Sequence, residues 1–132
     1  MDIERIHKAL TGGETARVEF KSCRDKISNS VYDTVCSFSN HSGGLIILGF
    51  DDDMNLIGVN KNASVNLKKN IINTLGNKEV FFPKLTIEPE IEEYDGKTII
   101  VIDVPVSQYP VRYKNKYFDR VGDADMDITD NM

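Results

Sequence analysis

The stretch from Val35 to Asp53, VCSFSNHSGGLIILGFDDD, constrains the fold more than any other part of the chain. It combines the end of an amphipathic helix, a break at Gly43-Gly44, an apolar run at 45–48 and a group of acidic residues. Such a run between turn residues is typical of a strand covered on both faces, and a helix must cover at least one of them. We therefore expect the centre of the domain here. Asp51 should lie at the carboxyl end of the strand, where ligands of α/β sheets tend to bind.

The size and composition of the chain indicate one domain. With 132 residues, 40% of them hydrophobic, it has enough apolar side chains for a single core. No segment approaches the roughly 18 apolar residues of a membrane span, and the N-terminus is too charged for a signal peptide. We expect a cytoplasmic protein with no membrane partner. Cys23 and Cys36 have no CxxC spacing, which indicates reduced thiols rather than a zinc site or a disulfide framework.

The charge of the chain argues against a simple electrostatic nucleic-acid binder. The formal net charge is −5, whereas Lys and Arg supply most non-specific affinity for phosphate. Four acidic residues lie in the last ten positions, which contain no Lys or Arg: Asp123, Asp125, Asp127 and Asp130. Residues 1–122 are therefore nearly neutral, which is compatible with DNA or RNA as a partner without requiring one. We expect the segment 123–132 to be a frayed tail or a linker.

Hydrophobic periodicity predicts an α+β arrangement. Helices are expected from a cap at Asp2 to about Gly12, and over 26–40 and 64–75. Strands are expected around 18–21 and over 45–50, 56–59, 85–91, 97–104, 111–113 and 117–121. Turn residues predict hairpins between 45–50 and 56–59, at Asp95-Gly96 and at 114–116, and Pro89 places its strand at an edge or a bulge. The predicted fold class is α/β (α+β), a mixed sheet with two main helices and β-hairpins.

Four segments together resemble the Schlafen-type AlbA-like domain: Glu14 with 18–21, then 38–51, 57–59 and 117–122. The resemblance covers about residues 14–125. It implies an α/β domain that is generally described as DNA-binding and is found in bacterial proteins described as transcriptional regulators, usually before further modules. We therefore expect a domain at 1–122, with 123–132 as an acidic tail or linker to C-terminal modules. The function predicted first is nucleic-acid (DNA) binding in a bacterial transcriptional regulator, which requires no cofactor.

The same resemblance implies an alternative activity, because some Schlafen proteins are divalent-metal endoribonucleases that act on structured RNA. Their catalytic, metal-binding acids correspond here to Glu14, Glu19 and Asp51, with Mg²⁺ or Mn²⁺ as the cofactor. Both are hard cations that prefer oxygen ligands. Lys21 lies on the same strand face as Glu19 and could stabilise charge on an attacked phosphate. The structural alternative is an exposed Glu19–Lys21 pair that contributes little, and a solvated acidic turn at 51–53.

Basic residues in two regions are the candidates for contact with nucleic acid: Lys21, Arg24, Lys26, Arg112, Lys114, Lys116 and Arg120. The hairpin tipped by Lys114 and Lys116 could bind phosphates, with Tyr113 and Tyr117 against sugar or base. Lysines at a hairpin tip also protect a sheet edge from aggregation. Arg120 can instead pair with Asp119 or another carboxylate.

Two further interpretations concern the glycines and the sheet edge. Gly43-Gly44 follows a helix, whereas a phosphate-binding loop runs from a strand into a helix, so we interpret both glycines as a helix stop. An exposed sheet edge would alternatively serve an interaction domain that forms a homodimer.

Overall fold

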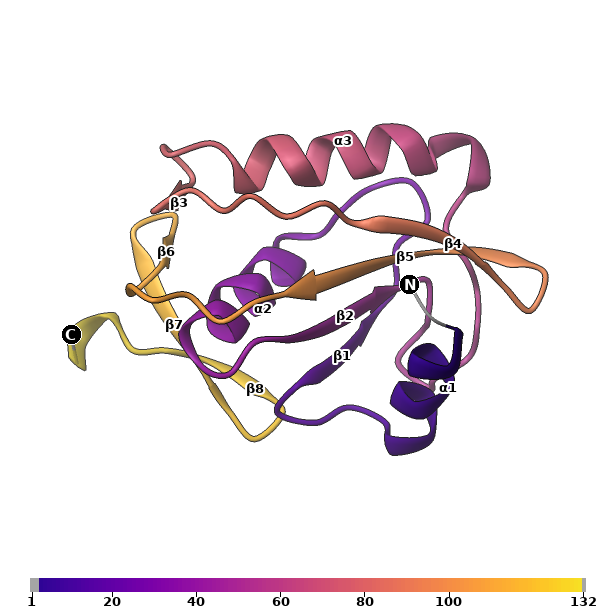
Figure 1. Cartoon of the computed structure of the whole chain (residues 1–132), viewed down its shortest axis with the longest axis horizontal. Helices are drawn as coiled ribbons and strands as arrows, with labels where there is room; N and C mark the ends of the chain where they lie inside the picture. Colours follow the sequence, from indigo (N-terminus) through magenta and orange to yellow (C-terminus); the bar gives the residue numbers. More distant parts are fainter. Residues whose placement is uncertain (1–2, 132) are drawn as a thin grey trace.

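The computed structural model describes residues 3–131 and shows two four-stranded sheets and three α-helices within that range (Figure 1). The first sheet has the order β1-β2-β5-β4 and the second the order β3-β6-β7-β8. Strand β2 pairs parallel with β1 and antiparallel with β5, so the predicted mixed sheet of an α+β fold is confirmed.

The bounds of the elements follow the chain. The helices are α1 Ile3–Gly12, α2 Asn29–Asn40 and α3 Ser64–Leu75, with short 3-10 helices η1 Lys61–Ala63 and η2 Thr129–Asn131. The first sheet contains β1 Val18–Lys21, β2 Gly44–Leu48, β4 Glu90–Tyr94 and β5 Lys97–Val104. The second contains β3 Phe81–Phe82, β6 Arg112–Tyr113, β7 Lys116–Val121 and β8 Ala124–Asp127.

Strand β2 lies in the middle of the first sheet and is buried on both faces. Ile46 and Leu48 pack in a core shared with α2 and α3, while Leu45 and Ile47 pack on the other face with residues of α1. All four side chains are buried. The prediction of a strand covered on both faces is therefore confirmed, and the helix that precedes it supplies one of the covers.

Helix α2 lies between the two sheets (Figure 1). Val35 and Phe38 share the core with β2, whereas Thr34 and Ser37 bind Asp125 of β8. Burial is continuous from Thr34 to Ser39. A helix buried on most sides differs from the half-exposed helix that an amphipathic stripe predicts.

The two glycines between α2 and β2 are explained by the chain reversal and by packing. Gly43 has φ +75°, and its N–H donates to the carbonyl of Phe38 at 2.8 Å. A Cβ at Gly43 would lie 2.7 Å from the carbonyl oxygen of Val104, and one at Gly44 would overlap the Phe38 ring. The helix stop predicted for this pair is confirmed.

Three predicted elements have different extents. Helix α2 begins at Asn29 rather than near position 26, and 85–89 is extended without a strand partner. The predicted strand 56–59 is wrong: only Leu56 bridges Phe50, whereas Val59 turns to Thr98 of β5. The N–H groups of residues 57 and 58 both donate to the carbonyl of Gly49, which prevents a regular ladder.

The prediction of a frayed or linking segment at 123–132 is wrong for residues 124–131. The chain reverses at Gly122, where φ is +62°, and β8 then pairs antiparallel with β7 in a register that places Asp125 opposite Arg120. The 3-10 helix η2 follows β8. The segment is therefore part of the folded domain. Asp2, the predicted cap of α1, lies outside the described residues.

The remaining composition-based expectations concern thiols and membranes. Cys23 and Cys36 are both free and buried. Among the residues that the structure describes, no helix has the length and apolar character needed to cross a bilayer.

Candidate functional site

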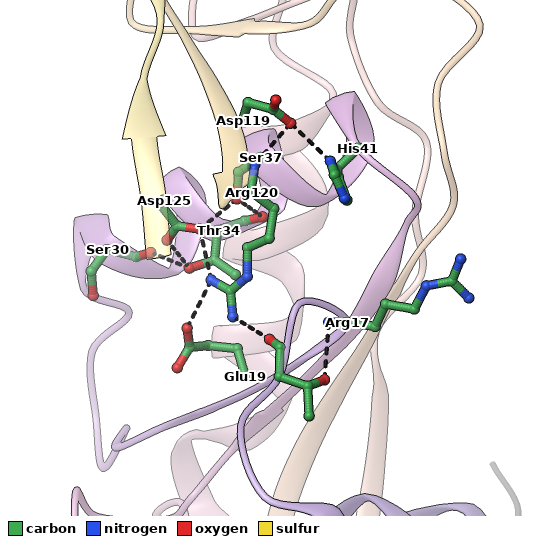
Figure 2. Close-up of polar contacts among 10 residues, drawn as sticks. Arg17, Glu19, Ser30, Thr34, Ser37, His41, Asp119, Arg120 and Asp125 are labelled. Carbon is green, nitrogen blue, oxygen red and sulfur yellow. Dashed lines mark hydrogen bonds and ion pairs between the residues drawn. The ribbon is translucent and has the colours of Figure 1, made fainter. Parts of the chain in front are cut away.

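A buried ionic cluster, here called the Arg120 network, joins β1, β7 and β8 to α2 (Figure 2). The Nη1 atom of Arg120 donates to Glu19 at 3.1 Å and to Asp125 at 2.8 Å, and Nη2 donates to the Thr15 carbonyl at 2.8 Å. The guanidinium carbon lies 4.8 Å from the centre of the Phe38 ring. Within residues 3–131, Nε is a buried donor with no hydrogen-bond partner. The fully buried guanidinium therefore ties three segments of the chain together.

Asp125 connects this network to the polar face of α2. The hydroxyl of Thr34 donates to its carboxylate at 2.6 Å, and the hydroxyl of Ser37 donates to the other oxygen (Figure 2). The sequence reasoning missed all three residues. The sequence offers one sign of this contact, which is that Thr34 and Ser37 lie beside the apolar stripe of the predicted helix. Thr and Ser are just as common at exposed helix positions, so the sign does not predict a buried hydrogen bond.

The prediction that Arg120 contacts nucleic acid is wrong in this structure, because its side chain has no exposed surface. Pairing with a carboxylate, the alternative, is confirmed for Glu19 and Asp125. Asp119 instead accepts the backbone N–H of Arg120 and lies 3.1 Å from the ring of His41.

Glu14 and Glu19 lie side by side, as the resemblance implied. Burial raises the pKa of Glu19 to about 7, and a hydrogen bond and like-charge repulsion from Glu14 act in the same direction. The positive charges of Lys21 and Arg120 oppose this rise in pKa. Glu19 can therefore hold a proton near neutral pH.

Asp51 does not join the two glutamates. Its carboxylate accepts hydrogen bonds from the backbone N–H groups of Asp53 and Asn55 at 3.0 and 2.8 Å, and from the Asn55 side chain at 3.2 Å. These bonds, led by the backbone of Asn55, lower the pKa of Asp51. Within the described part of the chain, no three His, Cys, Asp or Glu side chains are grouped to hold a metal ion. The predicted trio therefore does not fit a divalent cation in this arrangement.

Lys21 of β1 and two lysines of the β6–β7 hairpin, Lys114 and Lys116, lie near Asp33 of α2. We call Lys21, Lys114 and Lys116 the lysine cluster. Burial raises the pKa of Asp33, the negative charge of Asp125 adds to the rise, and the positive charges of Lys21, Lys116 and Lys114 oppose it. A hollow of about 220 Å³ beside Asp33 is lined by Lys114 and Lys116. The sequence identified each lysine, and the structure brings them together.

Of the other predicted basic residues, one is exposed and two contact groups of the protein elsewhere. Lys26 is exposed in the loop before α2. Arg24 donates to the carbonyls of residues 57 and 58 at 3.3 and 3.4 Å, and the Arg112 guanidinium lies 4.7 Å from the centre of the Phe82 ring.

The two tyrosines of the hairpin differ in exposure. Tyr113 is buried and stacks on Phe81 with 4.9 Å between the ring centres, so its predicted contact with a base or sugar is wrong. Tyr117 is half-buried.

Comparison with known proteins identifies relatives of this fold. The family model described as Schlafen, AlbA_2 matches residues 14–129. The N-terminal domain of a Nitrosomonas europaea protein, named as related to the ATP-dependent DNA helicase RecG, has a TM-score of 0.66 and 24% sequence identity, covering 93% of this chain and 90% of that chain. The DIP2311 protein from Corynebacterium diphtheriae also has a TM-score of 0.66, with 16% identity over 95% of this chain.

These structural similarities establish the fold alone, because the identities are low. The chain spans 29% of the length of the Corynebacterium protein. No curated protein matches the sequence.

Proposed function

Because the chain belongs to the Schlafen, AlbA_2 family, we propose that it is a nucleic-acid-binding domain and that its preferred ligand is duplex DNA. The similar Nitrosomonas domain comes from a protein whose name relates it to a DNA helicase, which supports the same class of ligand. The finer proposal is that this domain is the DNA-binding part of a bacterial transcriptional regulator.

The observation that carries the proposal is the convergence of the lysine cluster. On a chain with a net charge of −5, Lys114 and Lys116 line one hollow and the charge of Lys21 acts on the same Asp33, although Lys116 also lies 4.0 Å from Asp127; ammonium groups in this arrangement can contact phosphate. Lys114 and Asn115 have φ values of +49° and +66°, as a tight two-residue turn between β6 and β7 requires. The turn therefore presents its lysines on a defined ribbon.

The Arg120 network connects the strands that carry Lys21 and Lys116. Lys21 follows Glu19 by two positions in β1, and Lys116 precedes Arg120 in β7. The Glu19–Arg120 ion pair at 3.1 Å joins these strands, which belong to different sheets. We therefore assign the network the role of holding the spacing between the lysines.

The start of α2 adds backbone donors beside the lysines. Asn29, the first residue of α2, lines the same hollow as Lys114 and Lys116. The preceding Ser28 makes no side-chain cap hydrogen bond, and its carbonyl accepts the N–H of Val31 at 3.1 Å, which leaves the N–H groups of Asn29 and Ser30 for a phosphate oxygen. Lys26 lies in the loop that leads into this turn.

The test is fluorescence anisotropy with labelled duplex DNA over a range of salt concentrations. We expect Lys114→Ala/Lys116→Ala to weaken binding roughly tenfold and to reduce the salt slope by about 2, because two phosphate contacts are lost. Lys69→Ala/Lys97→Ala removes the same charge from exposed positions outside the cluster and serves as the matched control.

Equal binding by the two double variants would remove the lysine cluster from the proposal. Structured RNA of matched length, measured in parallel, separates a DNA preference from general phosphate binding. The metal-dependent endoribonuclease stays a prediction from the resemblance, because the carboxylates of Glu14, Glu19 and Asp51 are not grouped to hold a metal ion in the described part of the chain.

A further inference from the structure

A second hollow lies on the α1 side of the first sheet, separate from the lysine cluster. It has a volume of about 440 Å³ and is bounded by α1, the beginnings of β1 and β2, and the end of β5. Small-molecule sites typically occupy roughly 300 to 1,000 Å³, so a ligand the size of a mononucleotide fits this range.

The rim of this pocket is cationic although the chain as a whole is acidic. Arg5, Lys8 and Arg17 line it together with a single carboxylate, Asp103, which pairs with Arg5 at 2.6 Å. Within residues 3–131, the side chains of Lys8 and Arg17 have no ion-pair partner. Figure 2 shows the Arg17 side chain extending away from the Arg120 network. Two cations are therefore available to a multivalent anion.

The floor of the same pocket is apolar. Ala9 and Leu45 line it and are buried, and Val18 adds a further aliphatic surface at the start of β1. A flat ring could cover these side chains while an attached anion reached the cationic rim. The pocket thus combines two kinds of surface that an organic phosphate requires.

The glycines beside this pocket do not form a phosphate-binding loop. The N–H of Gly13 donates to the Ala9 carbonyl at 3.0 Å, and the N–H of Gly43 donates to the Phe38 carbonyl at 2.8 Å. Since both of these donors are occupied, the side chains of Lys8 and Arg17 are the charged donors assigned to an anion.

We propose that this pocket binds a small organic phosphate of mononucleotide size, with Lys8 and Arg17 on the phosphate and the apolar floor under the ring. The site is independent of the nucleic-acid role proposed above. It adjoins the Arg120 network through Thr15, which lines the pocket and whose carbonyl accepts a hydrogen bond from Arg120.

The test is an NMR titration of the full chain, labelled with ¹⁵N, with AMP, adenosine and inorganic phosphate as separate probes. We expect AMP to shift the amide signals of residues 12–18, 43–45 and 103–106, and to bind more tightly than either of the other two. Arg17→Gln and Lys8→Gln should each weaken AMP binding roughly tenfold, because each removes a charge-assisted hydrogen bond. Lys69→Gln, an exposed position on α3, is the matched control.

Three outcomes would overturn the inference. The first is AMP binding unchanged in both pocket variants, with circular dichroism confirming that they are folded. The second is shifts centred on Asp33 and the lysine cluster instead of the pocket. The third is a loss of duplex-DNA affinity in Arg17→Gln as large as its loss of AMP affinity, which would make the pocket part of a nucleic-acid surface.

Discussion

Helix α2 contacts two sheets through two kinds of interface. Toward β2, the buried side chains of Val35 and Phe38 pack with Ile46 in an apolar core. Toward β8, Thr34 and Ser37 donate hydrogen bonds to Asp125. An apolar interface loses stability in proportion to the contacts removed, whereas a buried ionic one depends on every partner being present.

The polar interface contains more carboxylates than cationic groups. One guanidinium, that of Arg120, serves the carboxylates of both Glu19 and Asp125. The same guanidinium also donates to the carbonyl of Thr15. The hydroxyls of Thr34 and Ser37 donate the further hydrogen bonds that the Asp125 carboxylate accepts. Removing a single member leaves a buried charge without compensation, which costs more than the intact pair contributes. The two interfaces of α2 should therefore respond differently to substitution.

The largest effect is expected for Arg120→Met, which keeps an unbranched stem but removes the charged guanidinium. Glu19 and Asp125 would be left buried without their partner, and we expect unfolding in urea to show a loss of about 3 to 5 kcal/mol. Arg112→Met, at a half-buried arginine outside the network, is the control. A loss below about 1 kcal/mol in Arg120→Met, equal to that of an ordinary surface pair, would contradict the assigned role.

The next effect is a dependence of stability on pH through Glu19. Its pKa is raised in the folded chain from 4.5 to about 7, so the folded state binds this proton more tightly than the unfolded state. This contribution of Glu19 to the free energy of unfolding is fully present below the pKa of the unfolded state. It is lost as the pH rises through the pKa of the folded state. Between about pH 4.5 and pH 7 the change is on the order of 3 kcal/mol.

This pH dependence is measured by urea unfolding at a series of pH values. Glu19→Gln cannot titrate, so its stability should vary much less between pH 5 and pH 8 than that of the unsubstituted chain. Carboxyl groups with lowered pKa values, such as Asp51 and Asp127, act in the opposite direction at lower pH. An identical pH profile for Glu19→Gln would show that another group controls this range.

The smallest effect is expected in the apolar interface. Ile46→Val removes one methylene from a fully buried side chain of β2 and should cost about 0.5 to 1.5 kcal/mol. Because no titrating group is involved, this loss should stay constant from pH 5 to pH 8. A loss that changed with pH as the Glu19 contribution does would mean that the two interfaces are coupled.

Regular elements could be predicted where local pattern and burial agree. The apolar spacing of 64–75 and 97–104 predicts α3 and β5 with the bounds found in the structure, and Asp95-Gly96 forms the expected turn between β4 and β5. By contrast, β8 was missed because ADMD has little hydrophobic alternation. It becomes a strand because β7 offers its free edge and Arg120 offers a charge partner.

The sequence by itself determined the centre of the apolar core. This centre consists of a buried strand at 45–48, the helix before it and the glycine helix stop between them. Period and polarity encode these features, because each depends on residues that are close in the chain. Only the tertiary structure decided which carboxylates pair with Arg120 and that Lys21 lies beside Lys114 and Lys116. The Glu19–Arg120 contact joins residues 101 positions apart, and Lys21 lies 93 positions before Lys114, so both depend on how the two sheets pack on α2, which no local pattern specifies.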